Sequence, residues 1–314
     1  MGDSARARTF TTDAIVLRRM DFSEADRILT VLTPYHGKLR LLAKGVRRPG
    51  SRMGGHLELF VHAKVQVARG RSLDLVNQAV TVDAHRAVRE DIVKAAHAFH
   101  IAELVDGFLE ENDNHPSVFT LLLDALSGLE EGLDGGATPS PHPLPEGEGT
   151  LAPLPLGEAG RRPAGPRTGE GAPSASNLSL LDRQFELHLL GAVGFRPQLT
   201  ECVFCRAELK PETNGYSVKL GGVLCPDCFA SQPSARGILP DALKLLRYLQ
   251  RTVPTGHMTL AAPDRVLREA EQVLREQMEF ALERRLRAAD FLRRVSPSSS
   301  SPPTLTLPPR GGGD

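Results

Sequence analysis

Short apolar runs separated by turn residues make up the pattern of the first 80 residues. One run alternates apolar and polar positions, which places its apolar side chains on one face of a strand, namely Val61, Ala63, Val65 and Val67. This run lies within the segment 57–67, and the others are 14–17, 28–32, 39–43 and 73–80. Turn residues separate the runs at 35–37, 45–55 and 69–71. Five short strands in about 70 residues predict a small Greek-key barrel such as an OB-fold, with an SH3-like barrel as the competing architecture.

From residue 84 the apolar residues recur every three or four positions, as on one face of a helix: Val88, Ile92, Ala95, Phe99, Ala102, Val105 and Leu109. Pro116 opens a second helix. Helical spacing returns at Leu178 and stops at Gly191 and Gly194. Two more helices are predicted at about 240–252 and 264–294. The pattern therefore predicts an α+β chain of several domains, in which an all-α domain follows the barrel.

Two segments lack any such pattern. The segment 135–176 holds nine Pro and nine Gly and has no aromatic residue, so it cannot bury enough apolar surface to offset its chain entropy. The tail 297–314 has a related composition. We expect both to be disordered. The predicted domains are then a barrel at 1–82, helical parts at 83–134, 177–201 and 231–296, and a cysteine module at 202–230.

Composition excludes several classes of protein. No apolar run reaches the roughly 18 residues that span a bilayer. The first residues contain no apolar stretch typical of a secretory signal. We therefore expect a cytoplasmic protein without membrane contact.

The four cysteines form two close pairs, and this is the strongest local signal. Cys202-x2-Cys205 is followed, after 19 residues, by Cys225-x2-Cys228. This spacing is typical of zinc sites, and 216–224 is predicted to form the hairpin that brings the pairs together. Four thiolates leave no open coordination position, which favours one structural Zn²⁺ over a catalytic ion. Redox-active thiols are the weaker alternative.

Catalytic motifs are absent from the chain. There is no G-x-S-x-G, G-x-G-x-x-G, H-E-x-x-H or phosphate-binding P-loop. His97 and His100 lie three residues apart on a predicted helix, where a metal pair is conceivable but two surface histidines are the more common arrangement. The sequence therefore favours a protein that is not an enzyme.

The zero formal net charge conceals a strong asymmetry along the chain. Residues 1–80 carry 14 Lys and Arg against 7 Asp and Glu, whereas residues 81–134 carry 3 against 12. This pattern is expected when one module alone faces a polyanion, although two solvated faces would also produce it.

Basic residues concentrate in and beside the predicted loop 45–55. The candidate contacts to a nucleic-acid backbone there are Lys38, Arg40, Lys44, Arg47, Arg48 and Arg52, with Arg69 and Arg71 as further members of the same face. Aromatic residues are scarce, and at most Phe22 and Tyr35 are candidates for stacking on bases. Phosphate contacts should therefore dominate, which makes binding salt-sensitive and nearly independent of sequence.

Several segments in order along the chain resemble the RecO family of bacterial DNA repair proteins, namely 12–18, 22–28, 32–38, 43–48, 189–197, 202–205 and 225–228. The resemblance covers most of the chain outside 135–176 and the tail. It implies an N-terminal OB-fold, a helical domain and an embedded four-cysteine zinc module.

The resemblance also implies a function: a protein that binds single- and double-stranded DNA, anneals complementary strands and helps to load RecA. The implied partners are RecR and the C-terminal tail of single-strand-binding protein, with RecA acted on indirectly, and the implied location is the cytoplasm at the nucleoid. The alternatives are an RNA-binding OB-fold and zinc protein of translation or ribosome assembly, and a zinc hydrolase or nuclease. The latter would need an open coordination site with a base near it, and the sequence shows neither.

Overall fold

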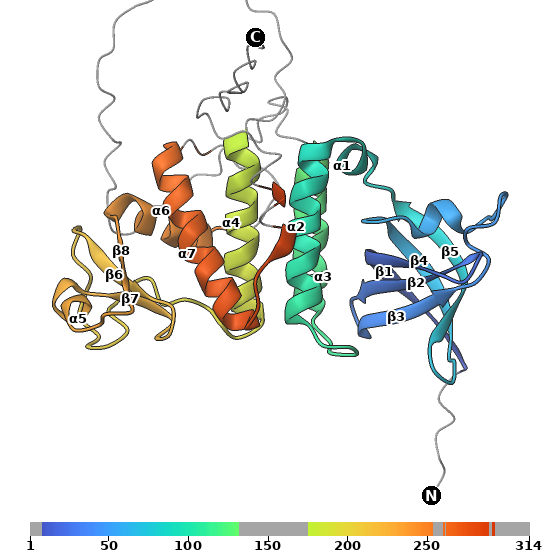
Figure 1. Cartoon of the computed structure of the whole chain (residues 1–314), viewed down its shortest axis with the longest axis horizontal. Helices are drawn as coiled ribbons and strands as arrows, with labels where there is room; N and C mark the ends of the chain where they lie inside the picture. The colour runs from blue at the N-terminus through green and yellow to red at the C-terminus, as the bar shows by residue number, and fades with distance from the viewer. Residues whose placement is uncertain (1–7, 132–174, 254–259, 261, 289–290, 293–314) are drawn as a thin grey trace, which may run out of the picture.

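The computed structural model describes residues 8–131, 175–253, 260, 262–288 and 291–292. Its N-terminal part is a closed barrel with strand order β1-β2-β3-β5-β4 (Figure 1). The strands are β1 (Thr9–Phe22), β2 (Asp26–Thr33), β3 (Gly37–Ala43), β4 (His62–Ala68) and β5 (Asp74–Asp83). The five-stranded OB-like barrel predicted from the sequence is thus confirmed.

Strand β1 is long enough to pair with two neighbours. Its first half runs antiparallel to β4 and its second half to β2, with a bulge between Val16 and Arg18 where the strand changes partners. β3 and β5 pair in parallel and close the barrel. The predicted strand at 57–67 is wrong in its first part: a 3₁₀ turn, η1 (Gly54–Leu57), precedes β4, and Phe60 takes a left-handed conformation (φ 64°) before the strand begins.

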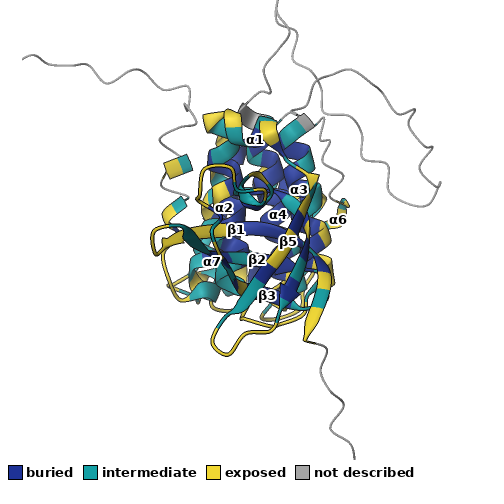
Figure 2. Cartoon of the chain, turned by 90° about the vertical axis from the view of Figure 1, so that its right-hand side faces the viewer, coloured by how far each residue is buried: buried dark blue, intermediate teal, exposed yellow. Residues whose placement is uncertain are grey.

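The helical region contains α1 (Arg86–Glu90), α2 (Ile92–Phe108), α3 (Pro116–Glu131), α4 (Ala175–Ala192), α6 (Pro240–Arg251) and α7 (Asp264–Leu282). Four barrel side chains face outward and belong to the helical core instead of the barrel's own: Ile15, Leu17, Leu32 and Phe60. The hydrophobic core of the helices therefore continues onto one outer face of the barrel. Figure 2 shows the buried positions on the strands and on the helices behind them.

Two helix boundaries differ from the prediction. The apolar pattern through 88–109 is divided between α1 and α2, because the extended residue Asp91 caps α2 with its carboxylate, which accepts hydrogen bonds from the N–H groups of Val93 and Lys94. The last helix ends at Leu282 instead of residue 294, since Glu283 takes a left-handed conformation (φ 52°). Leu286 then turns back into the core.

Helix α4 lies between the other helices, and it is buried on almost every side. Its carboxylates face α2: Asp182 lies 2.7 Å from His97 Nδ1, and Glu186 lies 2.7 Å from His100 Nε2. Both histidines are almost fully buried, so their prediction as surface residues is wrong. Arg183 completes the cluster, with its guanidinium 2.8 Å from Glu186.

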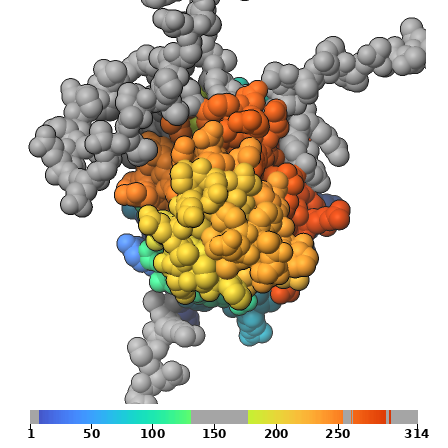
Figure 3. Space-filling model, turned by 90° about the vertical axis from the view of Figure 1, so that its left-hand side faces the viewer, coloured from blue at the N-terminus to red at the C-terminus, as the bar shows by residue number. Residues whose placement is uncertain are grey.

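The cysteine-bearing segment forms the end of the molecule opposite the barrel (Figures 1 and 3). It contains a three-stranded sheet in the order β7-β6-β8, with β6 (Asn214–Ser217), β7 (Gly222–Leu224) and β8 (Arg236–Ile238), and the short helix α5 (Pro226–Ala230). β6 and β7 are antiparallel, which confirms the predicted hairpin between the cysteine pairs.

The predicted disorder of 135–176 and 297–314 concerns segments that lie outside the described residues except for 175 and 176. These two residues belong to α4, so the predicted boundary of the disordered segment is wrong there. Within the described part of the chain, no helix has both the length and the apolar character needed to cross a bilayer.

Candidate nucleic-acid interface and metal centre

The loop that follows β3 is held in place by its own backbone. The Asp26 carboxylate accepts a hydrogen bond from Gly45 N (2.7 Å), and Arg47 N donates to the carbonyl of Ala25 (2.9 Å). Val46 is buried in the barrel core and acts as the apolar anchor of the loop. Gly45 takes a left-handed conformation (φ 65°), which glycine adopts without steric cost. The loop is thereby fixed beside the β1–β2 hairpin.

With the backbone anchored, the basic side chains of the loop point to solvent. Lys44, Arg47, Arg48 and Arg52 are all exposed. Arg47 bridges to the β1–β2 hairpin, where its guanidinium lies 3.5 Å from an Asp21 oxygen. Four exposed cations on one anchored loop form a surface suited to phosphate groups. We call residues 44–52 the basic loop.

Lys38 and Arg40, on β3, have different surroundings. Lys38 is only 8% exposed, and its ammonium donates to the Asp106 carbonyl (2.5 Å) and to a carboxylate oxygen of the same residue (3.0 Å). This lysine therefore fastens the barrel to the end of α2 instead of facing solvent as the sequence suggested. Arg40 remains exposed, with its Nε 3.7 Å from a Glu111 oxygen.

Arg69 and Arg71 lie in the β4–β5 hairpin, at the other end of the barrel. The Arg69 guanidinium lies 4.7 Å from the centre of the Phe10 ring, which in turn contacts His36 at the start of β3. The basic loop leaves the far end of β3, and a seven-residue strand spans about 20 Å. The β4–β5 hairpin and the basic loop leave the barrel at different ends (Figure 1). The structure thus does not bring these two arginines together with the basic loop, contrary to their predicted place on one face.

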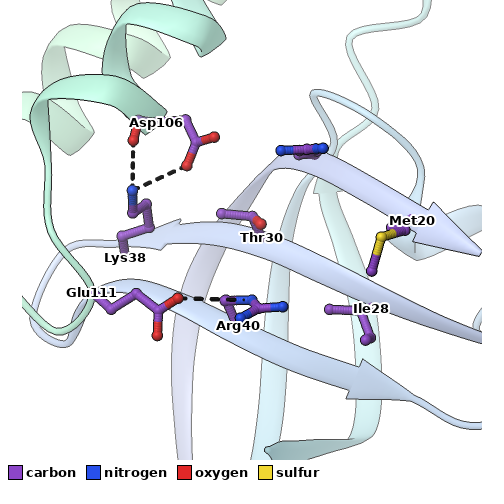
Figure 4. Close-up of a pocket in the computed structure, with 8 residues that line it drawn as sticks. Met20, Ile28, Thr30, Lys38, Arg40, Asp106 and Glu111 are labelled. Atoms are coloured by element: carbon purple, nitrogen blue, oxygen red, sulfur yellow. Dashed lines mark hydrogen bonds and ion pairs between the residues drawn. The ribbon is translucent and has the colours of Figure 1, made fainter. Parts of the chain in front are cut away.

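The outer face of β1, β2 and β3 contains a groove of about 250 Å³ that the sequence did not reveal (Figure 4). Strand register places Arg18, Thr30 and Arg40 in one row across the three strands. Met20 and Ile28 form the next row along. Lys38, together with Asp106 and Glu111 from the end of α2 and the loop after it, completes the lining. Arg18 and Met20 could have been found only from the strand register, because the bulge in β1 shifts which residues face outward.

Of the aromatic candidates for stacking, Phe22 and Tyr35 are exposed (47% and 72%). Phe22 lies at the end of β1, beside the basic loop, whereas Tyr35 lies in the β2–β3 turn at the opposite end of β3. Phe60 is buried and packs edge-on against Phe99 of α2, with ring centroids 5.0 Å apart. Phe22 is therefore the aromatic residue available near the exposed cations of the loop.

The four cysteines meet at the far end of the molecule. All four sulfur atoms lie within 4.8 Å of one another, and Cys205 Sγ and Cys225 Sγ are 3.7 Å apart. This separation is too long for a disulfide and close to the roughly 3.8 Å expected between two sulfurs bound tetrahedrally to Zn²⁺ at about 2.3 Å. The cluster could therefore hold a metal ion such as zinc.

Local backbone geometry aims the thiols at this point. Arg206 takes a left-handed conformation (φ 64°) and its N–H donates to the carbonyl of Cys202, which closes a tight turn around the first pair. The second pair stands at the start of α5. Burial raises the pKa of the Cys202 thiol, but hydrogen bonds from the backbone of Cys205, Cys225 and Phe204 outweigh it and lower the pKa to about 6. The pKa values of Cys205 and Cys228 are raised instead, the latter by desolvation and by its contacts with the other three thiols. A bound cation would favour the thiolate, which is the form in which cysteine binds metals.

One further group of metal-ligand type lies between the barrel and α3. His85 Nδ1 is 2.9 Å from a Glu130 oxygen and 3.7 Å from an Asp83 oxygen. The short hydrogen bond between His85 and Glu130 ties the start of α1 to α3 and accounts for the arrangement without an ion.

Comparison with known families gives two adjoining matches. The family model described as "Recombination protein O N terminal" matches residues 7–85, and the one described as "Recombination protein O C terminal" matches 89–139 and 172–290. The interruption at 140–171 falls inside the Pro- and Gly-rich segment.

Curated relatives agree with these matches. A protein of Roseiflexus sp. (strain RS-1), named DNA repair protein RecO, is 36% identical over 289 residues, which cover 91% of this chain and 86% of that protein. A protein of the same name from Symbiobacterium thermophilum is 32% identical and covers 90% of this chain and 96% of the relative. One from Dehalococcoides mccartyi (strain ATCC BAA-2266 / KCTC 15142 / 195) is 31% identical, with 91% and 96% covered.

Proposed function

Because this chain belongs to the RecO family of DNA repair proteins, we propose that it acts as a recombination mediator without catalysing a covalent step. In this proposal it binds single- and double-stranded DNA, anneals complementary strands and assists the loading of RecA onto DNA coated with single-strand-binding protein. Family membership supports the role in DNA repair and recombination, and the finer activities are the proposal.

The observation that carries the proposal is the anchored basic loop. Its four exposed cations stand on a backbone that is already ordered, so little conformational entropy is lost when phosphates bind. Arg18 and Arg40 extend the positive surface from the loop into the groove. Cations that neutralise phosphates on two strands lower their mutual repulsion while bases pair. In this proposal Arg69 and Arg71 make a separate contact with DNA at the other end of β3. Lys38 contributes indirectly, by packing the barrel against the end of α2.

The experiment is strand annealing of complementary oligonucleotides under a salt titration. Wild type should accelerate annealing at low salt, and Arg47→Glu/Arg48→Glu should lose most of that acceleration, because two attractive contacts become repulsive. The matched control is Arg265→Glu/Arg268→Glu on α7, which reverses the same number of exposed charges away from the barrel. Equal loss in both double variants would assign the effect to net charge and contradict the proposed surface.

Competition with RNA of matched length separates the proposal from an RNA-binding role. A protein whose contacts are mainly to phosphates should bind single-stranded DNA and RNA of the same length with similar affinity, and it should anneal DNA. Strong preference for RNA without annealing of DNA would overturn the proposal.

We further propose one structural Zn²⁺ bound by Cys202, Cys205, Cys225 and Cys228. The compatible sulfur separation and the full set of four thiols support it. The ion would join the turn after α4 to α5, since each supplies one pair of ligands.

The proposed partners follow from family membership. They are RecR and the C-terminal tail of single-strand-binding protein, with RecA acted on indirectly, in the cytoplasm at the nucleoid. A pull-down of each purified partner with the full chain tests this, and absence of binding to both RecR and single-strand-binding protein would contradict it.

A further inference from the structure

Two carboxylates from the helical region reach the basic residues of β3, and they do so in unlike ways. Asp106 holds Lys38 through two short hydrogen bonds, and the lysine side chain is nearly buried. Glu111 faces Arg40 across 3.7 Å, and both side chains are about half exposed. The first contact is a permanent part of the barrel–helix junction, whereas the second is a loose surface pair that another anion can replace (Figure 4).

The position of Glu111 does not depend on Arg40. The N–H of the next residue, Asn112, donates to the carbonyl of Lys38 (2.9 Å), and Lys38 and Glu111 form a short parallel bridge between their backbones. The loop also packs closely against Gly37, where an added Cβ would lie 2.0 Å from the Asp113 carbonyl oxygen. The backbone therefore keeps this carboxylate at the mouth of the groove whether or not it is paired with the arginine.

Arg40 lies in the part of the groove best suited to a phosphate. Cross-strand register puts it beside Thr30, and Thr30 beside Arg18, so two guanidinium groups flank one hydroxyl. Adjacent strands are about 4.8 Å apart, so the two arginines stand roughly 10 Å apart at their backbones and can converge on one phosphodiester. The exposed Met20 continues the surface next to Arg18 with an apolar side chain.

We propose that Glu111 is a built-in competitor for the phosphate of a bound strand: it pairs with Arg40 when the groove is empty and is replaced by a phosphodiester when DNA binds. This inference rests on the proposed function, because it concerns the affinity of the same surface for DNA. The competitor keeps the strand exchangeable, which suits a protein that must release the duplex after annealing.

The competition should change the affinity for DNA more than its dependence on salt. A phosphate that binds a free arginine releases a counterion, and each such contact contributes about 0.7 to the slope of log K against log salt for single strands. The counterions come from the strand, and an isolated carboxylate such as Glu111 does not hold one in the same way, so the slope should be nearly the same with and without it. Removing the competing charge should therefore raise the affinity for DNA at each salt concentration.

The test compares Glu111→Gln with Glu110→Gln in the full chain, by binding of a single-stranded oligonucleotide across a range of salt concentrations. Glu110 is the exposed preceding residue, and its substitution removes the same charge from the same loop. Glu111→Gln should bind about two- to fivefold more tightly than wild type, with nearly the same slope. Glu110→Gln should bind nearly as wild type does, and thermal melting should show that both variants are folded.

A second variant, Arg40→Gln, tests whether Arg40 is the residue for which Glu111 and the phosphate compete. It should weaken binding more in the Glu111→Gln background than in wild type, because only there is the arginine free before the strand arrives. If Glu111→Gln matches Glu110→Gln in affinity while wild type binds DNA, the competitor role is wrong and the proposed function stands. If wild type binds no oligonucleotide at low salt, the proposed function fails and this inference fails with it.

Discussion

In the barrel, the cations of the basic loop lie at the surface, while in the helical region five ionisable side chains lie inside, between α2 and α4. The loop cations come from nine consecutive residues, and all four are exposed. The buried groups are His97 and His100 on α2, and Asp182, Arg183 and Glu186 on α4. In the proposed function the barrel thus uses charge for contact with DNA, whereas the helical region uses it to fasten two helices.

This difference between the two regions follows from how far their charged side chains are hydrated. An exposed charge keeps its water, so it can be changed at little cost in stability. A buried charge has lost its water, so removing its partner leaves it uncompensated at a cost of several kcal/mol. Substitutions in the barrel loop should therefore alter binding and spare stability, whereas those between α2 and α4 should alter stability first.

Removal of the metal should have the largest effect, because a structural zinc site contributes roughly 10–16 kcal/mol of apparent binding free energy. We expect a strong chelator to lower the melting temperature and to expose the amides of β6 and β7 to hydrogen exchange. The amides of the barrel strands should stay protected, since the barrel closes through its own backbone.

Cys205→Ser provides the matched variant, because this cysteine is exposed and its substitution opens no core cavity. It should reduce the bound zinc from one equivalent and lower the melting temperature. Unchanged zinc content and an unchanged melting temperature would contradict the structural role of the site.

The next effect in size should come from Glu186→Gln. This change removes the carboxylate that holds both His100 and Arg183, each nearly buried, and should cost about 3–5 kcal/mol in the free energy of unfolding measured in urea. Glu110→Gln, an exposed control, should change it by less than about 0.5 kcal/mol. If Glu186→Gln lowers the free energy of unfolding by less than about 1 kcal/mol, the buried charges matter little more to stability than exposed ones, and the contrast between the two regions fails.

The same contrast explains what the sequence could predict. The sequence predicts features that depend only on residues close together in the chain. These are the alternating apolar positions of β4, the two cysteine pairs and the cluster of Arg47, Arg48 and Arg52. His97 and His100 were misjudged because their partners are more than 80 residues away, on a helix whose packing depends on the whole fold. A local pattern carries no information about such partners.

The residues of the candidate interface likewise fall into those whose position the sequence predicts and those whose position depends on the whole fold. The cations of the basic loop could be predicted because the loop contains few residues able to pack. The position of Lys38 could not, since it depends on Asp106 of α2, and neither could the separation of Arg69 from the loop, since that depends on strand register. Glu111 reaches Arg40 only because the barrel and the helices adjoin.

The smallest expected effect is a pH dependence of the α2–α4 contact. Burial lowers the pKa of His100, but the hydrogen bond to Glu186 and the charges of Glu186 and Asp182 outweigh burial and the opposing charge of Arg183, so the pKa is raised above its ordinary value of 6.5. A raised pKa in the folded state means that the charged pair contributes its full stability below pH 6.5 and loses it as the pH rises through the folded value. Stability in urea should therefore fall as the pH rises above 6.5.

His100→Gln should flatten this fall, because glutamine can still donate a hydrogen bond to Glu186 but does not titrate. The fall should be smaller than the loss caused by Glu186→Gln, since the neutral imidazole keeps its hydrogen bond to the carboxylate while the variant removes the charge altogether. Charge reversal at Arg47 and Arg48 should leave the pH profile of unfolding as it is in wild type, because these side chains remain hydrated in both states. If the Arg47→Glu/Arg48→Glu profile changes as much as that of His100→Gln, the charges of the barrel loop are coupled to the fold, and the contrast between the two regions fails.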